Sequence, residues 1–164
     1  MFETVERFDF RRVRRFEFGE HLFESRDISE PPVSVTCGDW QEFAGRDFSG
    51  DAVYGFDFGR PDTDGGSLTI DLGTVNYSCE LFLNGKSRGI RCMPPYRYTV
   101  PSADLETVNH VLLRVSNTPA NQYVYTHAFD NYSEGEKGPY QKRELEFEKE
   151  SLVSGLLGPV RLLI

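Results

Sequence analysis

The sequence has no long apolar run, and this absence excludes membrane-spanning proteins. No segment of the 164 residues approaches the roughly 20 consecutive apolar residues of a transmembrane helix, so we expect no membrane partner. Residues 1–15 alternate charged residues with phenylalanine and lack the apolar core of a signal peptide. We therefore expect a cytoplasmic protein, unless the sequence is one domain of a larger secreted enzyme.

Cysteine is also scarce, which argues against a disulfide framework or a zinc site. The three cysteines, Cys37, Cys79 and Cys92, are odd in number and show no C-x-x-C spacing. Cys79 lies in an alternating apolar stretch, so we expect it to pack as a small core residue.

Basic residues are fewer than acidic residues. Lysine and arginine number 18 against 26 acidic residues, which gives a formal net charge of −8. Because binding to nucleic acid depends on basic side chains that neutralise phosphates, we expect no nucleic-acid partner. The arginine cluster of residues 11–15 is expected on the solvent side of a strand, paired with acidic residues, while Phe8 and Phe10 pack inward.

What the sequence has in quantity is aromatic residues in alternating stretches. It contains 13 phenylalanines and 8 tyrosines but one tryptophan, a composition that favours half-buried strands and predicts an all-β protein. Apolar and polar residues alternate with period two in several segments. These are residues 52–58, 67–72, 79–83, 96–100 and 111–115. Asn84-Gly85 predicts a type I′ turn between a strand ending at Leu83 and a returning strand over 86–91.

The length fits one domain. Glu30-Pro31-Pro32 predicts a break, so we expect a leading strand or linker segment over 1–32, packed on the domain, and the domain itself over 33–164. Ser102 is expected to cap a short helical turn. A polar, aromatic loop is predicted from Tyr123 to Gln141, and the stretch 142–150 fits a strand best, with a short helix left open.

Several short motifs occur in a fixed order along residues 37–163. They are Trp40 with Phe43, Phe48-Ser49-Gly50, Asp71-Leu72-Gly73, Leu83-Asn84-Gly85, Pro94-Pro95-Tyr96, Val115 to Asn121, and Gly155 to Val160. In this order they resemble the galactose-binding-like domain of glycoside hydrolase family 2 and of related α-L-rhamnosidase-type enzymes. The resemblance implies a jelly-roll β-sandwich that serves as an accessory, carbohydrate-associated domain of a larger glycosidase, whose catalytic barrel has no counterpart here.

The resemblance also implies that a loop can hold a structural calcium ion. The Asp62-Thr63-Asp64-Gly65 fragment fails the full calcium-loop template, because the closing glutamate is missing, and we interpret it as a plain turn. No other cofactor is expected.

Catalysis by the chain itself is not indicated. Glycoside hydrolysis needs two carboxyl groups about 5 to 10 Å apart, one of them with a raised pKa, and no such pair stands out among the many acidic residues. The histidines are isolated, and no Gly-x-Ser-x-Gly elbow is present.

Sugar binding needs an aromatic face for the pyranose ring and amide or carboxylate groups for its hydroxyls. The candidate residues are Trp40, Asn117, Asn121, Tyr123, Tyr125 and Asp130. Two of them have an alternative role. Asn117, at a strand end, fits a backbone hydrogen bond equally well, and Trp40 fits burial beneath the sheet better than stacking on a sugar.

Three hypotheses therefore come from the sequence. The first is a non-catalytic carbohydrate-binding accessory domain. The second is a structural β-sandwich that packs against a glycosidase catalytic domain without binding sugar. The third, which the sequence favours least, is a self-sufficient glycosidase.

Overall fold

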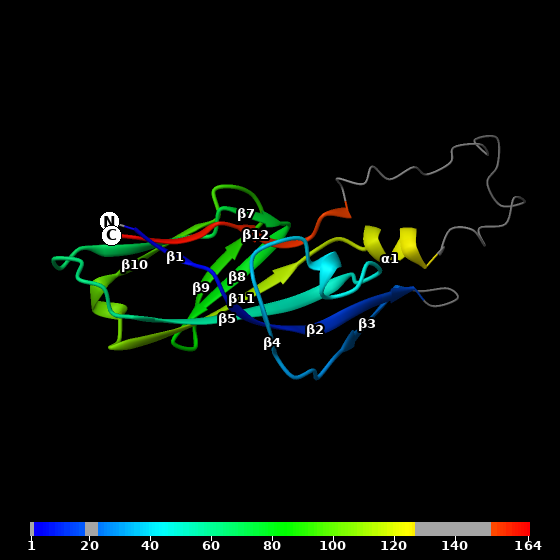
Figure 1. The fold of residues 1–164 in the computed structure, drawn as a ribbon, viewed down its shortest axis with the longest axis horizontal. Coiled ribbons are helices and arrows are strands. Elements are labelled where there is room, and N and C mark those ends of the chain that lie inside the picture. The colour runs from blue at the N-terminus through cyan, green and yellow to red at the C-terminus, as the bar shows by residue number, and fades with distance from the viewer. Residues whose placement is uncertain (1, 19–22, 127–151) are drawn as a thin grey trace, which may run out of the picture.

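The computed structural model describes residues 2–18, 23–126 and 152–164 and contains two main antiparallel sheets (Figure 1). The smaller sheet has the strand order β1-β13-β6-β10. Its strands are β1 (Phe2–Val5), β13 (Val160–Leu163), β6 (Ser67–Asp71) and β10 (Arg97–Pro101). Because β1 pairs with β13 from Phe2 opposite Leu163 to Val5 opposite Val160, the two termini lie side by side at one end of the molecule (Figure 1).

The larger sheet has the order β3-β2-β5-β11-β8-β9, with β4 also paired to β2. Its strands are β3 (Phe23–Asp27), β2 (Phe8–Phe18), β5 (Gly50–Gly59), β11 (Val108–Ser116), β8 (Ser78–Leu83), β9 (Lys86–Arg91) and β4 (Val33–Val35). A two-stranded sheet pairs β12 (Gly155–Gly158) with β7 (Thr74–Asn76). The prediction of an all-β jelly-roll sandwich is confirmed.

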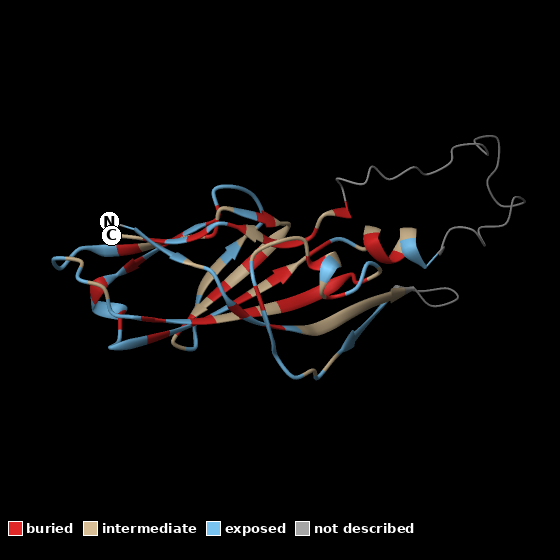
Figure 2. Cartoon of the chain, viewed as in Figure 1, coloured by how far each residue is buried: buried red, intermediate tan, exposed pale blue. Residues whose placement is uncertain are grey.

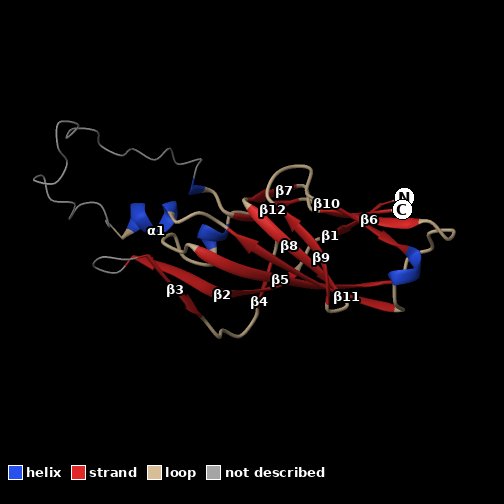
Figure 3. Cartoon of the chain, turned by 180° about the vertical axis from the view of Figure 1, so that it is seen from behind, coloured by secondary structure: helices blue, strands red, loops and turns tan. Residues whose placement is uncertain are grey.

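Within residues 2–18, 23–126 and 152–164, helix is confined to short pieces. These are the 3-10 turns η1 (Trp40–Glu42) and η2 (Ser102–Asp104) and the helix α1 (Ala120–Tyr125). Seen from the front and from behind, α1 lies at the end of the sandwich opposite the termini (Figures 1 and 3). No helix in the described ranges is long and apolar enough to cross a membrane.

The core is rich in aromatic side chains, and buried residues are spread along the strands of both main sheets (Figure 2). The alternating segments deliver one face of each strand to it, as period-two patterning requires. The largest fully buried side chains are Trp40, Tyr54, Tyr98, Phe8, Phe48, Leu68, Ile70, Leu72, Leu81, Leu83, Leu113 and Leu156. Cys79 is buried as well, as predicted.

The hairpin predicted at Asn84-Gly85 is confirmed. Both residues have positive φ, 50° at Asn84 and 78° at Gly85, and they connect β8 directly to β9. The Asn84 carboxamide also accepts a hydrogen bond from the backbone N–H of His110 at 2.8 Å, which ties the turn to β11.

The first 32 residues contribute to both sheets. β1 pairs with β13 in the smaller sheet, and β2 pairs with β5, β3 and β4 in the larger one. As predicted, Phe8 and Phe10 are buried, while three of the β2 arginines, Arg12, Arg14 and Arg15, form ion pairs with acidic residues. The division of the chain at residue 33 stays a prediction.

Two local predictions differ from the structure. Pro101, not Ser102, is the N-cap of η2, and the Ser102 hydroxyl donates instead to the carbonyl of Gly66 at 2.6 Å, because the chain enters this turn directly from β10. The first three residues of the predicted loop, Tyr123 to Tyr125, lie in α1 instead, and residues 127–141 of that prediction lie outside the described residues. The prediction for residues 142–150 falls outside the described residues.

Candidate functional site

Three of the predicted sugar-binding residues lie inside the protein. Trp40 and Asn121 are fully buried, and Asn117 is 7% exposed. All three surround the end of the sandwich where the loop before β5, the end of β11 and the segment before β12 meet. Their sugar-binding role stays a prediction, and the buried positions of Asn117 and Trp40 favour the structural alternative for these two residues.

Asn117 is the centre of a buried hydrogen-bond network. Its carbonyl oxygen accepts from the backbone N–H of Gly50 at 2.9 Å, and its amide nitrogen donates to the carbonyl of Phe48 at 3.1 Å and to the hydroxyl of Ser154 at 3.0 Å. One side chain thereby joins three segments that are far apart in the sequence. A buried amide satisfied in this way fixes their relative positions.

The same network holds α1 in place. The amide nitrogen of Asn121 donates to the carbonyl of Leu152 at 2.8 Å, and the backbone N–H of Gln122 donates to the Ser49 hydroxyl at 3.0 Å. A six-residue helix is too short to be stable alone, so these contacts must stabilise it. The buried asparagines therefore position the helix that carries the two predicted tyrosines.

Trp40 packs beneath the larger sheet, in the position that the sequence favoured for it. Its ring lies 5.1 Å from the ring of Phe48 and 6.5 Å from that of Phe10, measured between centroids. The indole N–H has no hydrogen-bond partner among the residues that the structure describes. Trp40 is thus part of the aromatic core.

The remaining candidates belong to α1 or follow it. Tyr125 is exposed and Tyr123 is half-buried, so the surface of α1 presents aromatic area to solvent. Asp130 lies outside the described residues. Among the predicted residues that the structure describes, Tyr125 has the most accessible aromatic side chain.

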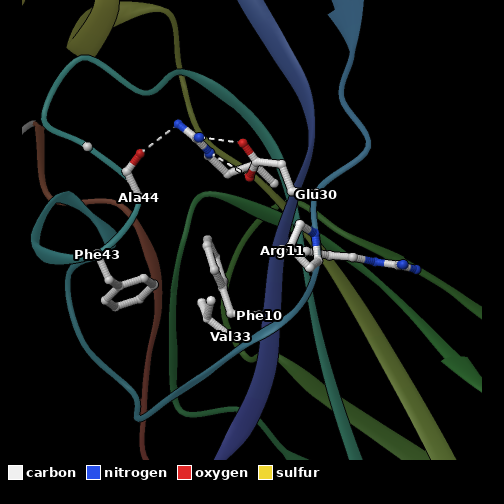
Figure 4. A pocket seen from close by; sticks show the side chains of 9 residues that line it. Phe10, Arg11, Glu30, Val33, Phe43 and Ala44 are labelled. Carbon is white, nitrogen blue, oxygen red and sulfur yellow. Dashed lines mark hydrogen bonds and ion pairs between the residues drawn. The ribbon is translucent and has the colours of Figure 1, made fainter.

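A pocket that the sequence did not predict opens beside Phe43 (Figure 4). Its volume is about 470 Å³. We call it the Phe43 pocket, and it is lined by Phe10, Arg11, Arg12, Glu30, Pro31, Val33, Phe43, Ala44 and Gly45. In the close-up, Phe43 faces Phe10 and Val33 on one side, Glu30 lies on the other, and the Arg11 side chain points away (Figure 4).

The polar side of this pocket is an ion pair with two parallel contacts. Nε of Arg12 donates to one carboxylate oxygen of Glu30 at 2.9 Å, and a terminal guanidinium nitrogen donates to the other. The remaining terminal nitrogen donates to the carbonyl of Ala44 at 3.0 Å. These hydrogen bonds raise the pKa of Arg12 and lower the pKa of Glu30, so both groups are charged at neutral pH.

Sequence reasoning missed the Phe43 pocket because its parts are distant along the chain. Arg12 and Glu30 are 18 residues apart, and Ala44 is 32 residues from Arg12. The one available signal was Glu30 immediately before two prolines, which was interpreted only as a break in the chain.

A second, smaller pocket of about 370 Å³ lies on the outer face of the larger sheet. His110 on β11 and Asp57 on β5 pair across it at 2.7 Å, and Leu112 adds an exposed apolar side chain. Both members of the pair are largely exposed, so solvent screens their interaction.

The described part of the chain contains no candidate metal site. No group of three or more His, Cys, Asp or Glu residues there could hold an ion. The turn at Asp62 to Gly65 is closed by hydrogen bonds, including one from the backbone N–H of Asp64 to the Asp62 carboxylate at 3.2 Å.

Comparison with known proteins places the fold among glycoside hydrolases. No family model and no curated protein matches the sequence. A rhamnosidase from Novosphingobium sp. PP1Y matches 99% of this chain with a TM-score of 0.60 and 24% identity, and a β-glucuronidase from Ruminococcus gnavus matches 71% with a TM-score of 0.52 and 17% identity. The chain spans 15% of the rhamnosidase and 22% of the glucuronidase. It therefore shares its β-sandwich fold with a small part of each of these much longer enzymes.

Proposed function

We propose that this chain is a non-catalytic accessory domain of a glycoside hydrolase and that it recognises carbohydrate at the surface of α1 and the residues that follow. The observation that carries the proposal is the buried amide network beneath this helix. Asn117 and Asn121 fix the short helix to the sandwich, which presents Tyr125 and Tyr123 on a rigid support. A preorganised aromatic surface is what binding of a pyranose ring requires.

In this proposal the candidate residues have different tasks. Tyr123, Tyr125 and Asp130 contact the sugar, while Asn117, Asn121 and Trp40 hold the site from beneath. The fold relationship to a rhamnosidase and a β-glucuronidase supports a carbohydrate-related role. We further propose that the carbohydrate is bound next to a catalytic domain in the same enzyme.

The state of the carboxylates supports a non-catalytic role. A general acid for glycoside hydrolysis must be protonated at working pH. Asp51 is instead paired with Arg114, Asp71 with Arg97, and Glu30 with Arg12. The hydrogen bonds from Arg12 lower the pKa of Glu30 and so stabilise its ionised form.

Isothermal titration calorimetry tests sugar recognition. The chain is titrated with galactose, rhamnose, glucuronate, xylose and mannose, with and without calcium, because the family resemblance implies that a structural ion can be present. We expect millimolar binding of at least one sugar, and loss of most of it in Tyr125→Ala. Met93→Ala, which removes an exposed side chain outside α1, is the matched control. An absence of heat with all five sugars contradicts the recognition half of the proposal.

A second candidate function, a module that packs against a catalytic domain without binding sugar, is favoured by a specific observation. Several large apolar side chains are exposed outside α1, including Phe2, Val33, Ile90, Met93 and Leu112. Such side chains mark an interface where they form one contiguous patch. Sedimentation at increasing concentration tests this candidate, which predicts association of the isolated chain together with no response to sugar.

An intracellular location also stays a proposal. Its support is that Cys37, Cys79 and Cys92 are free thiols in the structure, as expected of a protein in a reducing compartment.

A further inference from the structure

We propose that the Phe43 pocket is a second saccharide site that binds one ring of a neutral sugar. This inference rests on the proposed function, because it assigns a further subsite and a sugar class to the same recognition role. The pocket lies on β2, on the chain before and within β4, and on the residues after η1, whereas the proposed tyrosine site lies on α1.

The polar side of the pocket has unused hydrogen-bonding capacity. A guanidinium has five N–H donors, and Arg12 engages three of its nitrogens, each through a single contact, with Glu30 and Ala44. Each Glu30 oxygen accepts one of these contacts and keeps a second lone pair. The side chains of Arg12 and Glu30 are 28% and 29% exposed, so a ligand can reach them. Adjacent sugar hydroxyls can therefore accept from Arg12 and donate to Glu30.

The opposite side of the pocket is apolar and partly open. The rings of Phe10 and Phe43 meet edge to face, 4.8 Å apart between centroids, and Phe10 is buried while Phe43 is half-buried. Val33 is exposed beside them (Figure 4). The C–H face of a pyranose ring needs such a surface, and the polar groups across the pocket are placed for its hydroxyls.

The site is held in shape before any ligand arrives. Two contacts between Arg12 and Glu30 fix both side chains, the contact with Ala44 joins them to the loop after η1, and the guanidinium lies 5.4 Å from the centre of the Phe48 ring. Little side-chain freedom is then lost on binding, which favours affinity. The volume of about 470 Å³ is ample for one sugar ring and lies in the range of small-molecule sites.

Charge balance selects the class of sugar. Arg12 is neutralised by Glu30, and the side chain of Arg11, the other lining arginine, points away from the pocket (Figure 4), so the polar side of the pocket has no surplus charge for an ionic ligand. A carboxylate-bearing sugar would have to compete with Glu30 for Arg12, and the negative charge of Glu30 would repel it. We therefore expect neutral sugars such as galactose, rhamnose, mannose or xylose to bind in preference to glucuronate.

An amide chemical-shift titration of four proteins tests this assignment. These are the unmodified chain, Glu30→Gln, Phe43→Leu and Asp71→Asn, each titrated with the same five sugars. Glu30→Gln keeps the shape of the side chain but removes its charge, and Phe43→Leu keeps apolar volume but removes the flat ring. Asp71→Asn is the matched control, because it breaks a comparable pair with Arg97 in the other sheet.

We expect a neutral sugar to shift the amides of Glu30, Val33 and Phe43 to Gly45 as well as those near α1. Glu30→Gln and Phe43→Leu are expected to raise about tenfold the dissociation constant fitted to the shifts of Glu30, Val33 and Phe43 to Gly45. Asp71→Asn is expected to leave this constant unchanged.

Each contrary result has a separate meaning. Shifts confined to residues 117–132 would overturn this second site and leave the proposed function standing, whereas no shift with any sugar would overturn both. Tighter binding of glucuronate than of the neutral sugars, or equal weakening by Asp71→Asn, would also overturn the assignment.

Discussion

The side-chain amide of Asn117 joins the end of β11 to residues 48–50 and to Ser154. Its partners are the N–H of Gly50, the carbonyl of Phe48 and the hydroxyl of Ser154, all in the interior. Water cannot replace these contacts easily, because the residue is almost completely buried. The sequence left two roles open for Asn117, sugar binding and a hydrogen bond to the backbone. In the structure its side chain hydrogen-bonds the backbone.

Replacing this amide should destabilise the protein strongly. Asn117→Ala leaves a buried N–H and a buried carbonyl without partners, and we expect the free energy of unfolding to fall by about 2 to 4 kcal/mol. Urea denaturation followed by circular dichroism measures this. Thr118→Ala, an exposed neighbour, should change the value by less than about 0.5 kcal/mol. Equal effects of both variants would contradict the role assigned to the network.

Two buried tyrosines make the stability depend on alkaline pH. Burial raises the pKa of Tyr54 and of Tyr98 well above the ordinary value of 10.0. Because the pKa is higher in the folded state than in the unfolded state, their contribution is complete below the unfolded pKa. It is lost progressively as the pH rises above that value toward the folded pKa.

We therefore expect the free energy of unfolding to decrease above about pH 10. Denaturation midpoints measured at several alkaline pH values give the slope. Tyr98→Phe should make the slope shallower, and Tyr125→Phe, at an exposed position, should not alter it. A slope unchanged by Tyr98→Phe would show that this tyrosine does not control the alkaline loss of stability.

Residue-scale prediction from the sequence worked where the environment could be inferred from local pattern. Alternation placed Cys79, Phe8 and Phe10 in the core, and all three are buried. It could not decide the roles of Asn117 and Asn121, because their partners lie as many as 69 and 33 residues away.

At the scale of elements, the hairpin between β8 and β9 was the most predictable feature. Its turn depends on two adjacent residues, Asn84 and Gly85, whose conformational preferences are intrinsic. The Phe43 pocket was not predictable, since Arg12, Glu30 and Phe43 meet only after β2 and β4 have paired and the loop after η1 has folded back. Helix α1 escaped prediction because tertiary hydrogen bonds stabilise it.

Alanine substitutions test whether the turns at Gly73 and Gly85 require the positive φ that both glycines have. Gly85 has φ 78° and open space around it, so Gly85→Ala should cost about 1 kcal/mol from backbone strain alone. Gly73 has φ 65°, and an added Cβ would lie 2.4 Å from the carbonyl oxygen of Gly158. Gly73→Ala should therefore cost at least about 3 kcal/mol.

Gly59 is the matched control for both variants. Its φ lies outside the positive range, and nothing lies within 4 Å of an added Cβ, so Gly59→Ala should change the stability by less than about 0.5 kcal/mol. Denaturant midpoints rank the three variants. A Gly73→Ala variant as stable as Gly59→Ala would contradict the close approach of β7 and β12.

At the scale of the whole molecule, the first 32 residues complete both sheets. β2 is an interior strand of the larger sheet, and its Phe8 and Phe10 are nearly fully buried. The sequence predicted that this segment packs on the domain but could not show its position, because pairing partners in a sheet are set by long-range contacts rather than by local pattern.

Truncation measures the contribution of this segment. We expect a chain of residues 33–164 to lose cooperative unfolding, because β5 would lose one of its two neighbouring strands and the core would lose two aromatic side chains. Removal of residues 1–6, which deletes only the edge strand β1 and mostly exposed side chains, should leave a cooperative transition. Near-ultraviolet circular dichroism of buried Trp40 reports the outcome. Native-like unfolding of the 33–164 chain would establish that the domain begins at residue 33.

The most direct test of the central claim is an amide chemical-shift titration of the full chain with galactose, rhamnose, glucuronate, xylose and mannose. The account of a carbohydrate-recognising accessory domain predicts saturable shifts that include Tyr123, Tyr125 and Asp130. A spectrum unchanged by every sugar would contradict it and would indicate a module that only packs against its enzyme.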